Sequence, residues 1–496
     1  MKRIATRKEM QAIDAYSIHE IGIPGMVLME KASMALYEEV VKRFPDDHSR
    51  CLIVVEKGNN GGDGLALGRL LSEAGYLVDI YEIDGIRNAS DSYLLQKHIL
   101  EKLDIPVLCE IPDEEYDIII DGIFGVGLTR EVAGIHREVI TKLNKKDAYR
   151  IAIDVPSGVD ASTGRVLGAA FKADLTVTFG LSKIGLLLYP GAVYAGEVVV
   201  KDIGFPKAAV DEVNPGAFTY EEGDQCKIPA RNPDSHKGTY GRVLVVAGNI
   251  NMAGAAYLSG KSAYKSGSGL VRIFTREENR IILQTLLPEA ILTTYTSLDD
   301  GIPALSEAMD WADVIVFGPG IGRGENIEWF LHLIRDQAKV PVVIDADGLN
   351  EISAMEDRGQ NFLKGFSVPV ILTPHILEMS RLSGHTVSEI KEDRISLAKE
   401  YAKDNGVILV LKDSRTIITD GTDKLYINTN GNSGMATGGS GDVLSGILGG
   451  MLAAKMKPFE AACMAVFLHG RSGDAAAEEI GEASVMAGDL IKHILN

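Results

Sequence analysis

The stretch Gly434-Met435-Ala436-Thr437-Gly438-Gly439-Ser440-Gly441-Asp442 runs straight into an apolar segment, Val443 to Ala454, which reads as a helix. Four of its residues are glycine, which is typical of a tight turn. A turn at a helix start points unpaired backbone N–H groups outward, and the helix dipole favours negative charge there. The stretch therefore predicts a phosphate-binding turn.

Asp442 places a carboxylate at the mouth of this turn, where it would repel a phosphate. Such a carboxylate is explained if it takes a proton from, or orients, a hydroxyl that is being phosphorylated. The alternative is that Asp442 only caps the helix. Because the glycines of the turn and further signals upstream agree with phosphate chemistry, we interpret Asp442 as a catalytic residue.

Composition limits the class of protein. A chain of 496 residues is too long for one ordinary core, so two or three domains are expected. The net charge of −19 argues against binding to nucleic acid or to an anionic membrane. The four cysteines form no close pair and are expected to be reduced. No signal segment is visible, and no apolar run approaches the roughly 20 residues of a membrane span, so we expect a cytoplasmic protein.

Helical patterns alternate with short apolar runs along the whole chain, which predicts parallel strands buried on both faces. The first series of expected strands is Cys51–Val55, Tyr76–Tyr81, Asp117–Asp121, Arg150–Asp154 and Asp174–Phe179. The second series is Arg242–Ala247, Leu270–Phe274, Asp313–Phe317, Pro341–Asp345, Val370–Thr373 and Val407–Lys412. Two series predict an α/β protein of two domains, each a largely parallel sheet flanked by helices. A proline-rich polar region between Lys201 and Lys237 places the boundary near Tyr220, give or take about ten residues, hence domains 1–220 and 221–496.

Three of the expected strands end in aspartate, namely Asp121, Asp154 and Asp345. Each could simply cap the loop or helix that follows. In parallel sheets, however, ligands bind beyond the carboxyl ends of the strands. Glycine-bearing loops follow Asp121 and Asp154, which favours a ligand at these two positions.

The loop after the first strand, Glu56 to Gly64, contains the string Asn-Asn-Gly-Gly-Asp-Gly and precedes the helical pattern Leu65 to Leu71. A strand, a glycine loop and a helix in this order form the phosphate-binding arrangement of dinucleotide sites. The loop matches neither the G-x-G-x-x-G fingerprint nor the P-loop. The specific string is more informative than the glycine content alone.

Together with Val27–Ser33, Asp121–Gly127 and Asp154–Gly158, this string resembles the YjeF N-terminal family, the epimerase domain of NAD(P)H-hydrate repair enzymes. The resemblance covers roughly residues 5 to 210 and implies a Rossmann-like fold. It implies a potassium ion held by Asn60, Asp121 and Ser157, and Asp154 as the catalytic residue at the nicotinamide ring. Glu56 stands where the family usually has glycine. The residues implied to contact the hydrated nucleotide are Asn59, Asn60, Gly61, Gly62, Asp63, Gly125, Val126, Gly127, Leu128, Thr129, Arg130, Glu131 and Asp154.

Residues 236 to 496 resemble the ribokinase-like, ADP-dependent dehydratase of the same repair system. The matching strings are His236–Gly241, Gly318–Gly322, Asp345–Asn350, Thr373–His375, Leu411–Lys412 and Gly431–Asp442. The resemblance implies that Ala255, Gly322, His375 and Asp442 line the hydrate pocket. It also implies that ADP, as co-substrate, and Mg²⁺ bind in this domain. The residues implied to hold the nucleotide are Lys412, Asp413, Ser414, Arg415, Thr416, Gly438, Gly439, Ser440 and Gly441.

The function implied by the two resemblances is repair of hydrated NADH and NADPH. The first domain would interconvert the R and S hydrates, and the second would dehydrate the S form at the expense of ADP. The substrates would be small molecules, and we expect a homo-oligomer. Two alternatives stay open: a ribokinase-type small-molecule kinase, and a first domain that binds a nucleotide or a partner without catalysing.

Overall fold

The computed structural model describes residues 1–46, 48–83, 88–357 and 361–495. The chain forms two compact units, Arg3–Ala217 and Phe218–Asn496, and Met1–Lys2 groups with the second. These first two residues therefore do not belong to the unit predicted as 1–220. The N-terminal ammonium pairs with Asp224, and Lys2 Nζ lies 2.5 Å from Glu221 Oε1, which accounts for their placement.

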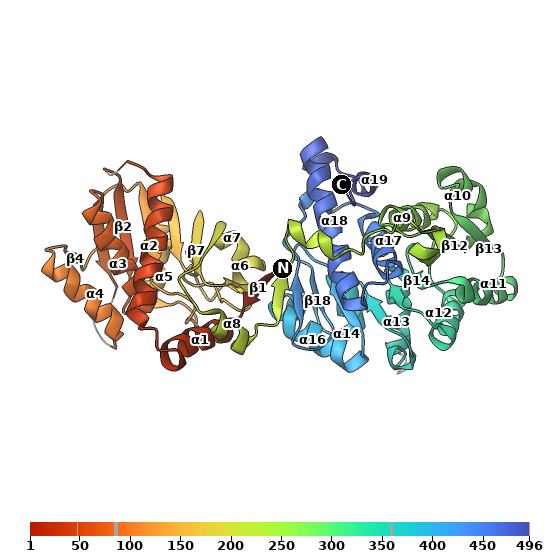
Figure 1. The fold of residues 1–496 in the computed structure, drawn as a ribbon, viewed down its shortest axis with the longest axis horizontal. Coiled ribbons are helices and arrows are strands. Elements are labelled where there is room, and N and C mark those ends of the chain that lie inside the picture. The colour runs from red at the N-terminus through yellow and green to blue at the C-terminus, as the bar shows by residue number, and fades with distance from the viewer. Residues whose placement is uncertain (47, 84–87, 358–360, 496) are drawn as a thin grey trace. The chain divides into compact units, whose positions relative to one another are not determined.

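In the described part of the first unit, seven strands form one parallel sheet in the order β4-β3-β2-β5-β6-β7-β9 (Figure 1). The strands are β2 (Arg50–Val55), β3 (Leu77–Glu82), β4 (Val107–Leu108), β5 (Ile118–Gly122), β6 (Tyr149–Ile153), β7 (Leu175–Phe179) and β9 (Glu197–Lys201). A short parallel pair, β1 (Lys2–Ala5) and β8 (Ser182–Lys183), lies outside this sheet. The five predicted strands and the parallel sheet are confirmed.

Helices cover both faces of this sheet. On one face, Leu36 of α2 and Leu65 of α3 pack with the strand residues Cys51, Ile53 and Val55. On the other face, Leu52 and Val54 pack with residues of α5. The alternation follows from the pleat, which turns successive side chains to opposite faces. The helices are α1 (Arg7–Ala15), α2 (Gly25–Arg43), α3 (Asn59–Glu73), α4 (Asp91–Lys102), α5 (Gly134–Leu143), α6 (Ile184–Leu187), α7 (Gly191–Ala195) and α8 (Lys207–Val213).

The sheet of the second unit is mixed. From β13 through β12, β11, β14, β15, β16 to β17 neighbouring strands are parallel, and β18 and β19 continue it antiparallel. The strands are β10 (Ala217–Thr219), β11 (Arg242–Val246), β12 (Leu270–Arg276), β13 (Ile291–Tyr295), β14 (Val314–Phe317), β15 (Val342–Ile344), β16 (Val370–Leu372), β17 (Ile408–Leu411), β18 (Ile417–Thr419) and β19 (Leu425–Ile427). The six strands predicted here are all present.

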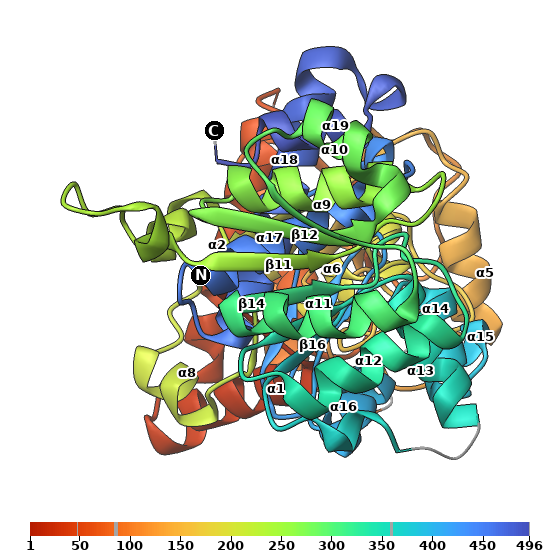
Figure 2. The ribbon, with the colours of Figure 1, turned by 90° about the vertical axis from the view of Figure 1, so that its right-hand side faces the viewer.

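Helices flank this sheet as well. Figure 2 shows α9 on one side of β11 and β12, and α11 and α12 on the other. The helices are α9 (Ala253–Lys265), α10 (Arg280–Leu286), α11 (Leu298–Trp311), α12 (Glu325–Gln337), α13 (Asp347–Asp357), α14 (Ile376–Ser383), α15 (Val387–Glu392), α16 (Arg394–Asn405), α17 (Ser440–Ala453), α18 (Pro458–Ile480) and α19 (Ala487–Lys492). A search of the described residues finds no helix with the length and hydropathy of a membrane span.

Two glycines of α17 fix its approach to α9. A Cβ on Gly446 would lie 2.1 Å from the backbone oxygen of Ser259, and one on Gly450 would lie 1.9 Å from Ser266 Oγ. Neither position can carry a side chain without moving one helix. The close packing sets the start of α17, and with it Asp442, at a fixed distance from the sheet.

Candidate active sites

The glycine turn of the second unit opens α17 as the sequence predicts. Gly439 is the residue before the helix and has φ of 89°, a left-handed conformation that glycine adopts without strain. At Gly438, a Cβ would meet no atom within 4 Å, so the turn faces open space. The first backbone N–H groups of α17 therefore lie next to open space that a ligand could occupy.

Asp442 is the third residue of α17, and its side chain makes no capping hydrogen bond. Among the described residues no hydrogen bond or ion pair reaches its carboxylate, whereas its backbone oxygen accepts a hydrogen bond from Ser259 Oγ at 3.0 Å. Burial raises the pKa of the Asp442 carboxyl to about 7; Asp345 adds to the rise and Lys412 opposes it. The helix-cap alternative has no support in this geometry, and the carboxylate is free to exchange a proton near neutral pH.

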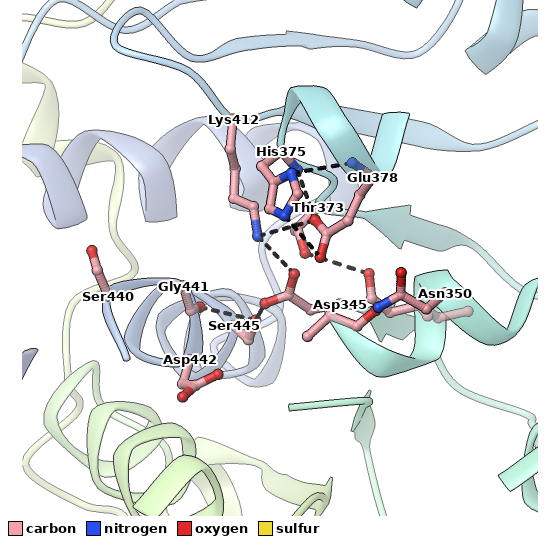
Figure 3. A network of polar contacts seen from close by, with 12 residues as sticks. Asp345, Asn350, Thr373, His375, Glu378, Lys412, Ser440, Gly441, Asp442 and Ser445 are labelled. Carbon is pink, nitrogen blue, oxygen red and sulfur yellow. Dashed lines mark hydrogen bonds and ion pairs between the residues drawn. The ribbon is translucent and has the colours of Figure 1, made fainter. Parts of the chain in front are cut away.

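Lys412 follows β17 and joins a buried polar network beside the turn (Figure 3). Its Nζ lies 2.8 Å from Asp345 Oδ1 and 4.0 Å from Glu378 Oε2. Ser445 of α17 donates to Asp345 Oδ2 at 2.7 Å, which ties the network to the helix. A Cβ on Gly441 would lie 3.5 Å from Lys412 Nζ, so the ammonium sits against the turn.

The charged side chains of this network stabilise one another in their charged forms. Burial disfavours the charge on Lys412, but Asp345 and Glu378 outweigh that effect and keep the lysine pKa above its ordinary value. Burial likewise disfavours the Asp345 carboxylate, but Lys412 and the hydroxyls of Ser445 and Thr373 keep the pKa of Asp345 below its usual range. The network therefore keeps Lys412 protonated close to the turn, with its charge paired by Asp345.

His375 has a structural role as well as the predicted one. Its Nδ1 accepts from the backbone N–H groups of Leu377 and Glu378, both at 3.1 Å, and so caps α14. Because Nδ1 accepts, the proton lies on Nε2, and the side chain is 49% exposed. Burial and then the Lys412 charge lower the pKa of His375, which keeps the ring neutral at neutral pH. The Nε2 donor faces Glu378 Oε1 at 3.5 Å, and the exposed half of the neutral ring is open to a ligand.

The other predicted residues of the second unit lie on two loops and in the first turn of α9. Gly322, with φ of 87°, donates its N–H to Asp347 Oδ2 at 2.9 Å. Ala255, the third residue of α9, lies against the same loop, since a Cβ on Gly320 would be 2.8 Å from the Ala255 Cβ. The loop 413–416, which follows Lys412, is held by hydrogen bonds and one ion pair. These are the Asp413–Arg394 pair, the Ser414 N–H on Asp413, the Arg415 bond to Thr429 O and the Thr416 hydroxyl on Asp413 O.

His469 of α18 was not singled out by the sequence. Its Nε2 lies 3.0 Å from the backbone oxygen and 3.2 Å from the hydroxyl of Ser440, the first residue of α17. Burial lowers the pKa of His469 to about 4, so the ring is neutral at physiological pH and donates from Nε2 to the carbonyl. This contact between α18 and Ser440 helps to hold the glycine turn in place. No local pattern marks it, because His469 follows a run of apolar helix residues.

The first unit holds a cavity of about 680 Å³ at the carboxyl ends of β2, β5 and β6. Of the predicted contact residues, Gly61, Gly62 and Glu131 do not line this cavity. A Cβ on Gly61 would overlap the backbone oxygen of Glu56 at 1.7 Å, and one on Gly62 would touch Met29 at 2.7 Å. These two glycines thus serve the packing of α3. The predicted residues that do line it are Asn59, Asn60, Asp63, Gly125, Val126, Gly127, Leu128, Thr129, Arg130 and Asp154.

Asp154 follows β6 with φ of 63° and faces this cavity. Its Oδ1 accepts from Lys183 Nζ at 2.5 Å, from Thr178 Oγ1 at 3.0 Å and from the Phe179 N–H at 3.2 Å. Lys183 is 1% exposed and was missed by the sequence reasoning. A lysine directly after an apolar strand and loop was the available signal.

Asn60, Asp121 and Ser157 meet around the loop 122–125. Asp121 is fully buried and accepts from the Ser157 hydroxyl at 2.6 Å and the Ser157 N–H at 2.7 Å. Asn60 lies against this loop, since a Cβ on Gly125 would be 2.7 Å from Asn60 Oδ1. Burial raises the pKa of Asp121 to about 6, against the bonds from Ser157. Three oxygen-bearing side chains, from α3, from β5 and from the loop after β6, therefore meet at the carboxyl ends of the strands.

Comparisons with known proteins cover both units. A family model described as NAD(P)H-hydrate dehydratase matches residues 243–496, and one described as YjeF-related protein N-terminus matches residues 25–185. The bifunctional NAD(P)H-hydrate repair enzyme Nnr of Moorella thermoacetica is 36% identical, covering 98% of this chain and 95% of that protein.

Two solved structures resemble the second unit. A ribokinase-like superfamily protein from Enterococcus faecalis is 30% identical, with a TM-score of 0.50 over 56% of this chain and 94% of that one. The ADP/ATP-dependent NAD(P)H-hydrate dehydratase of Bacillus subtilis, co-crystallised with ATP/Mg²⁺, is 33% identical, with a TM-score of 0.48 over 54% and 91%. Since both family models match in order and the Moorella relative aligns over nearly its whole length, the chain belongs to the family of bifunctional NAD(P)H-hydrate repair enzymes.

Proposed function

We propose that the first unit interconverts the R and S hydrates of NADH and NADPH and that the second unit dehydrates the S form with ADP. The observation that carries the proposal is Asp442. It is a carboxylate without a partner among the described residues, with a pKa of about 7, at the start of a helix that opens on a glycine turn. Phosphoryl transfer to a hydroxyl needs a base and an anion-binding turn together.

The chemistry of the second unit follows from this pair. The C6 hydroxyl of the hydrate attacks the terminal phosphorus of ADP, Asp442 takes the hydroxyl proton, and AMP leaves. The ring nitrogen then pushes out the phosphate from C6, and loss of a proton from C5 restores the reduced nicotinamide. The helix N-terminus and Lys412 stabilise charge on the phosphate as it develops. His375, whose side chain is half exposed and whose Nε2 lies 3.5 Å from Glu378 Oε1, is placed to contact the hydrate.

Mg²⁺, when bound, would neutralise charge on the nucleotide phosphates. The described residues contain no group of three or more His, Cys, Asp or Glu side chains arranged to hold a metal. This fits Mg²⁺, which is bound through one or two carboxylates plus the substrate's phosphates. Asp345 and Glu378, which flank Lys412 beside the turn, are the carboxylates that would hold it.

The surroundings of Asn60 support a potassium site in the first unit. Nδ2 of Asn60 is buried without a hydrogen-bond partner in the described part of the chain. Since an amide flip exchanges its oxygen and nitrogen ends, this end can present oxygen to a cation next to the buried Asp121 and Ser157. Hard monovalent cations prefer such oxygen ligands. Held there, potassium would order the loop 122–125 under the cavity, while Asp154 moves protons at the ring.

Two finer properties belong to the same proposal. Free Cys51, Cys109, Cys226 and Cys463 support a cytoplasmic protein. Exposed apolar side chains on α10, with Ile281 78% and Leu286 50% exposed, support the expected homo-oligomer. Light scattering after size exclusion measures the latter.

The test is turnover of each pure hydrate. With ADP and Mg²⁺ the S hydrate should return NADH without a lag, and the R hydrate should return it only after conversion to S. A stable phosphorylated small molecule as product, with no NADH formed, would establish the kinase alternative instead. R hydrate that is never consumed would leave a first unit that binds without catalysing.

A further inference from the structure

Three aspartates from separate elements line the cavity of the first unit. Asp14 comes from α1, Asp63 from α3 and Asp154 from the end of β6. Lys183 of β8 also lines it, and Glu56 and Arg130 lie around the same space. Several carboxylates that share one enclosed cavity repel one another unless cations or protons compensate them.

Of these three aspartates, only Asp154 forms an ion pair with a cationic side chain in the described part of the chain. Lys183 donates to Asp154 Oδ1, to Thr178 Oγ1 at 2.8 Å and to the backbone oxygen of Phe179 at 2.8 Å, which uses its three N–H bonds. The lysine therefore has no proton left for another carboxylate. Asp154 Oδ1 accepts three hydrogen bonds, whereas no bond to Oδ2 is found in the described part of the chain. Oδ2 is the oxygen left to take a proton from a ligand.

Asp63 lies in the opposite situation. Its backbone oxygen accepts from Ser33 Oγ at 3.1 Å, but no hydrogen bond or ion pair to its carboxyl group is found among the described residues. Burial raises the pKa of Asp63 well above its ordinary value, and the charges of Asp154 and Asp14 raise it further. Burial also raises the pKa of Asp14, His19 offsets part of that rise, and Asp154 adds to it. The cavity is thus lined by Asp154, a carboxylate paired with Lys183, and by Asp63, a carboxyl group whose burial disfavours its charged form.

We propose that Asp63 is the general acid of the epimerase site and that Asp154, through Oδ2, is its general base. This rests on the proposed epimerase function and divides the two proton transfers between two carboxyl groups whose environments differ. Asp63 was predicted from the sequence only as a contact residue. The division follows the rule that neighbouring titratable groups with different environments take opposite roles in acid–base catalysis.

The proton transfers balance without any further reactant. Asp154 takes the proton of the C6 hydroxyl, the C6–O bond becomes a carbonyl, and the N1–C6 bond breaks. The electron pair of that bond goes to N1, which receives the proton of Asp63. The open aldehyde turns about the C5–C6 bond, and the same steps run in reverse on the other face. The ring closes with the opposite configuration, and each carboxyl group regains its starting state.

The matched variants are Asp63→Asn, which keeps the shape but cannot give up a proton, and Asp63→Glu, which keeps the acid. The full-length protein is assayed with R hydrate as substrate and with S hydrate as an internal control. We expect Asp63→Asn to lower kcat for epimerisation by ~10²–10⁴ with KM nearly unchanged, and Asp63→Glu to recover part of it. Dehydration of S hydrate, which belongs to the second unit, should keep the wild-type rate, and urea unfolding of the variant checks that the first unit is folded.

The pH profile supplies the second readout. Epimerisation by the wild type should fall as the pH is raised through the pKa of Asp63, and this alkaline limb should be missing in Asp63→Asn. An Asp63→Asn variant with near-normal kcat, or a wild type without an alkaline limb, would overturn the acid role while leaving the epimerase function intact. A wild type that does not epimerise at all would overturn the proposed function and this inference with it.

Discussion

Asp154 and Asp442 are both carboxylates at the ligand-binding edge of an α/β unit, yet their surroundings are opposite. Asp154 accepts three hydrogen bonds, one of them from a buried lysine, whereas Asp442 receives none in the described part of the chain. Hydrogen bonds to a carboxylate stabilise its charged form, and burial without them stabilises the neutral form. The same residue type is thereby held by a salt bridge and hydrogen bonds in one unit, whereas burial raises its pKa to about 7 in the other.

The largest effect is expected where the bonded carboxylate is removed. Asp154→Asn tolerates the φ of 63° but leaves the fully buried Lys183 without an anion. We expect epimerisation to be lost and the free energy of unfolding of this unit to fall by about 3–5 kcal/mol. The double variant Asp154→Asn/Lys183→Met should regain stability, measured by urea unfolding, without regaining epimerisation. A double variant that epimerises would refute the role of Asp154.

Asp442→Asn should be milder for folding and severe for chemistry. No hydrogen bond is lost and a buried carboxylate is removed, so stability should not fall, while kcat for dehydration of S hydrate should fall by ~10²–10⁴. ADP should bind as tightly or more tightly, because a negative charge beside its phosphates is gone. Isothermal titration and single-substrate kinetics measure both. Near-normal kcat would show that Asp442 is not the base.

The pH dependence separates the two carboxylates. Asp442 has to be ionised to accept a proton, and its pKa is raised to about 7. The kcat/KM for dehydration should therefore rise by about tenfold per pH unit below pH ~7 and level off above it. The free energy of unfolding depends on pH in the opposite direction. A raised pKa in the folded state favours folding at low pH, and this contribution is lost as the pH rises through about 7. A profile that is flat from pH 5 to pH 8 in assays of the wild type would contradict the assignment.

The smallest effect concerns the glycine turn. Gly439→Ala forces alanine to φ of 89° and brings its Cβ to 2.5 Å from Leu258, so stability should fall by about 1–2 kcal/mol or somewhat more. Gly438→Ala is the matched control, since a Cβ there meets no atom within 4 Å and its φ is not positive; the change should be within about 0.5 kcal/mol. Equal losses in both variants would argue against a strained turn.

Local sequence was sufficient for the parts of the fold and site that depend on local patterns. Apolar runs predicted the buried strands, and the glycines before an apolar helix predicted the turn at Gly439 and the position of Asp442. The predicted ligand contacts of Gly61 and Gly62 stay predictions, because a glycine needed for close packing looks the same in the sequence as one needed for a ligand. The contacts of α3 with the Glu56 carbonyl and Met29 decide this, and they are tertiary.

Pairings between residues far apart in the sequence could not be predicted either, because they too are tertiary contacts. Lys183 and Asp154 are 29 residues apart, Lys412 and Asp345 are 67 apart, and His469 reaches Ser440 across 29. Nothing in a strand or helix pattern says which buried lysine meets which carboxylate. The predicted phosphate contact of Lys412 stays a prediction, although its ammonium lies against Gly441 as that contact requires.

The most direct test of the central comparison is complementation between Asp154→Asn and Asp442→Asn. A mixture of R and S hydrates is supplied with excess ADP and Mg²⁺, and recovered NADH is followed to completion. Asp154→Asn alone should stop once the S form is consumed, and Asp442→Asn alone should return almost no NADH. Mixed together, they should consume both hydrates, since one chain supplies the acid–base chemistry of the first unit and the other supplies that of the second. A mixture that stops where Asp154→Asn stops would contradict two independent active sites.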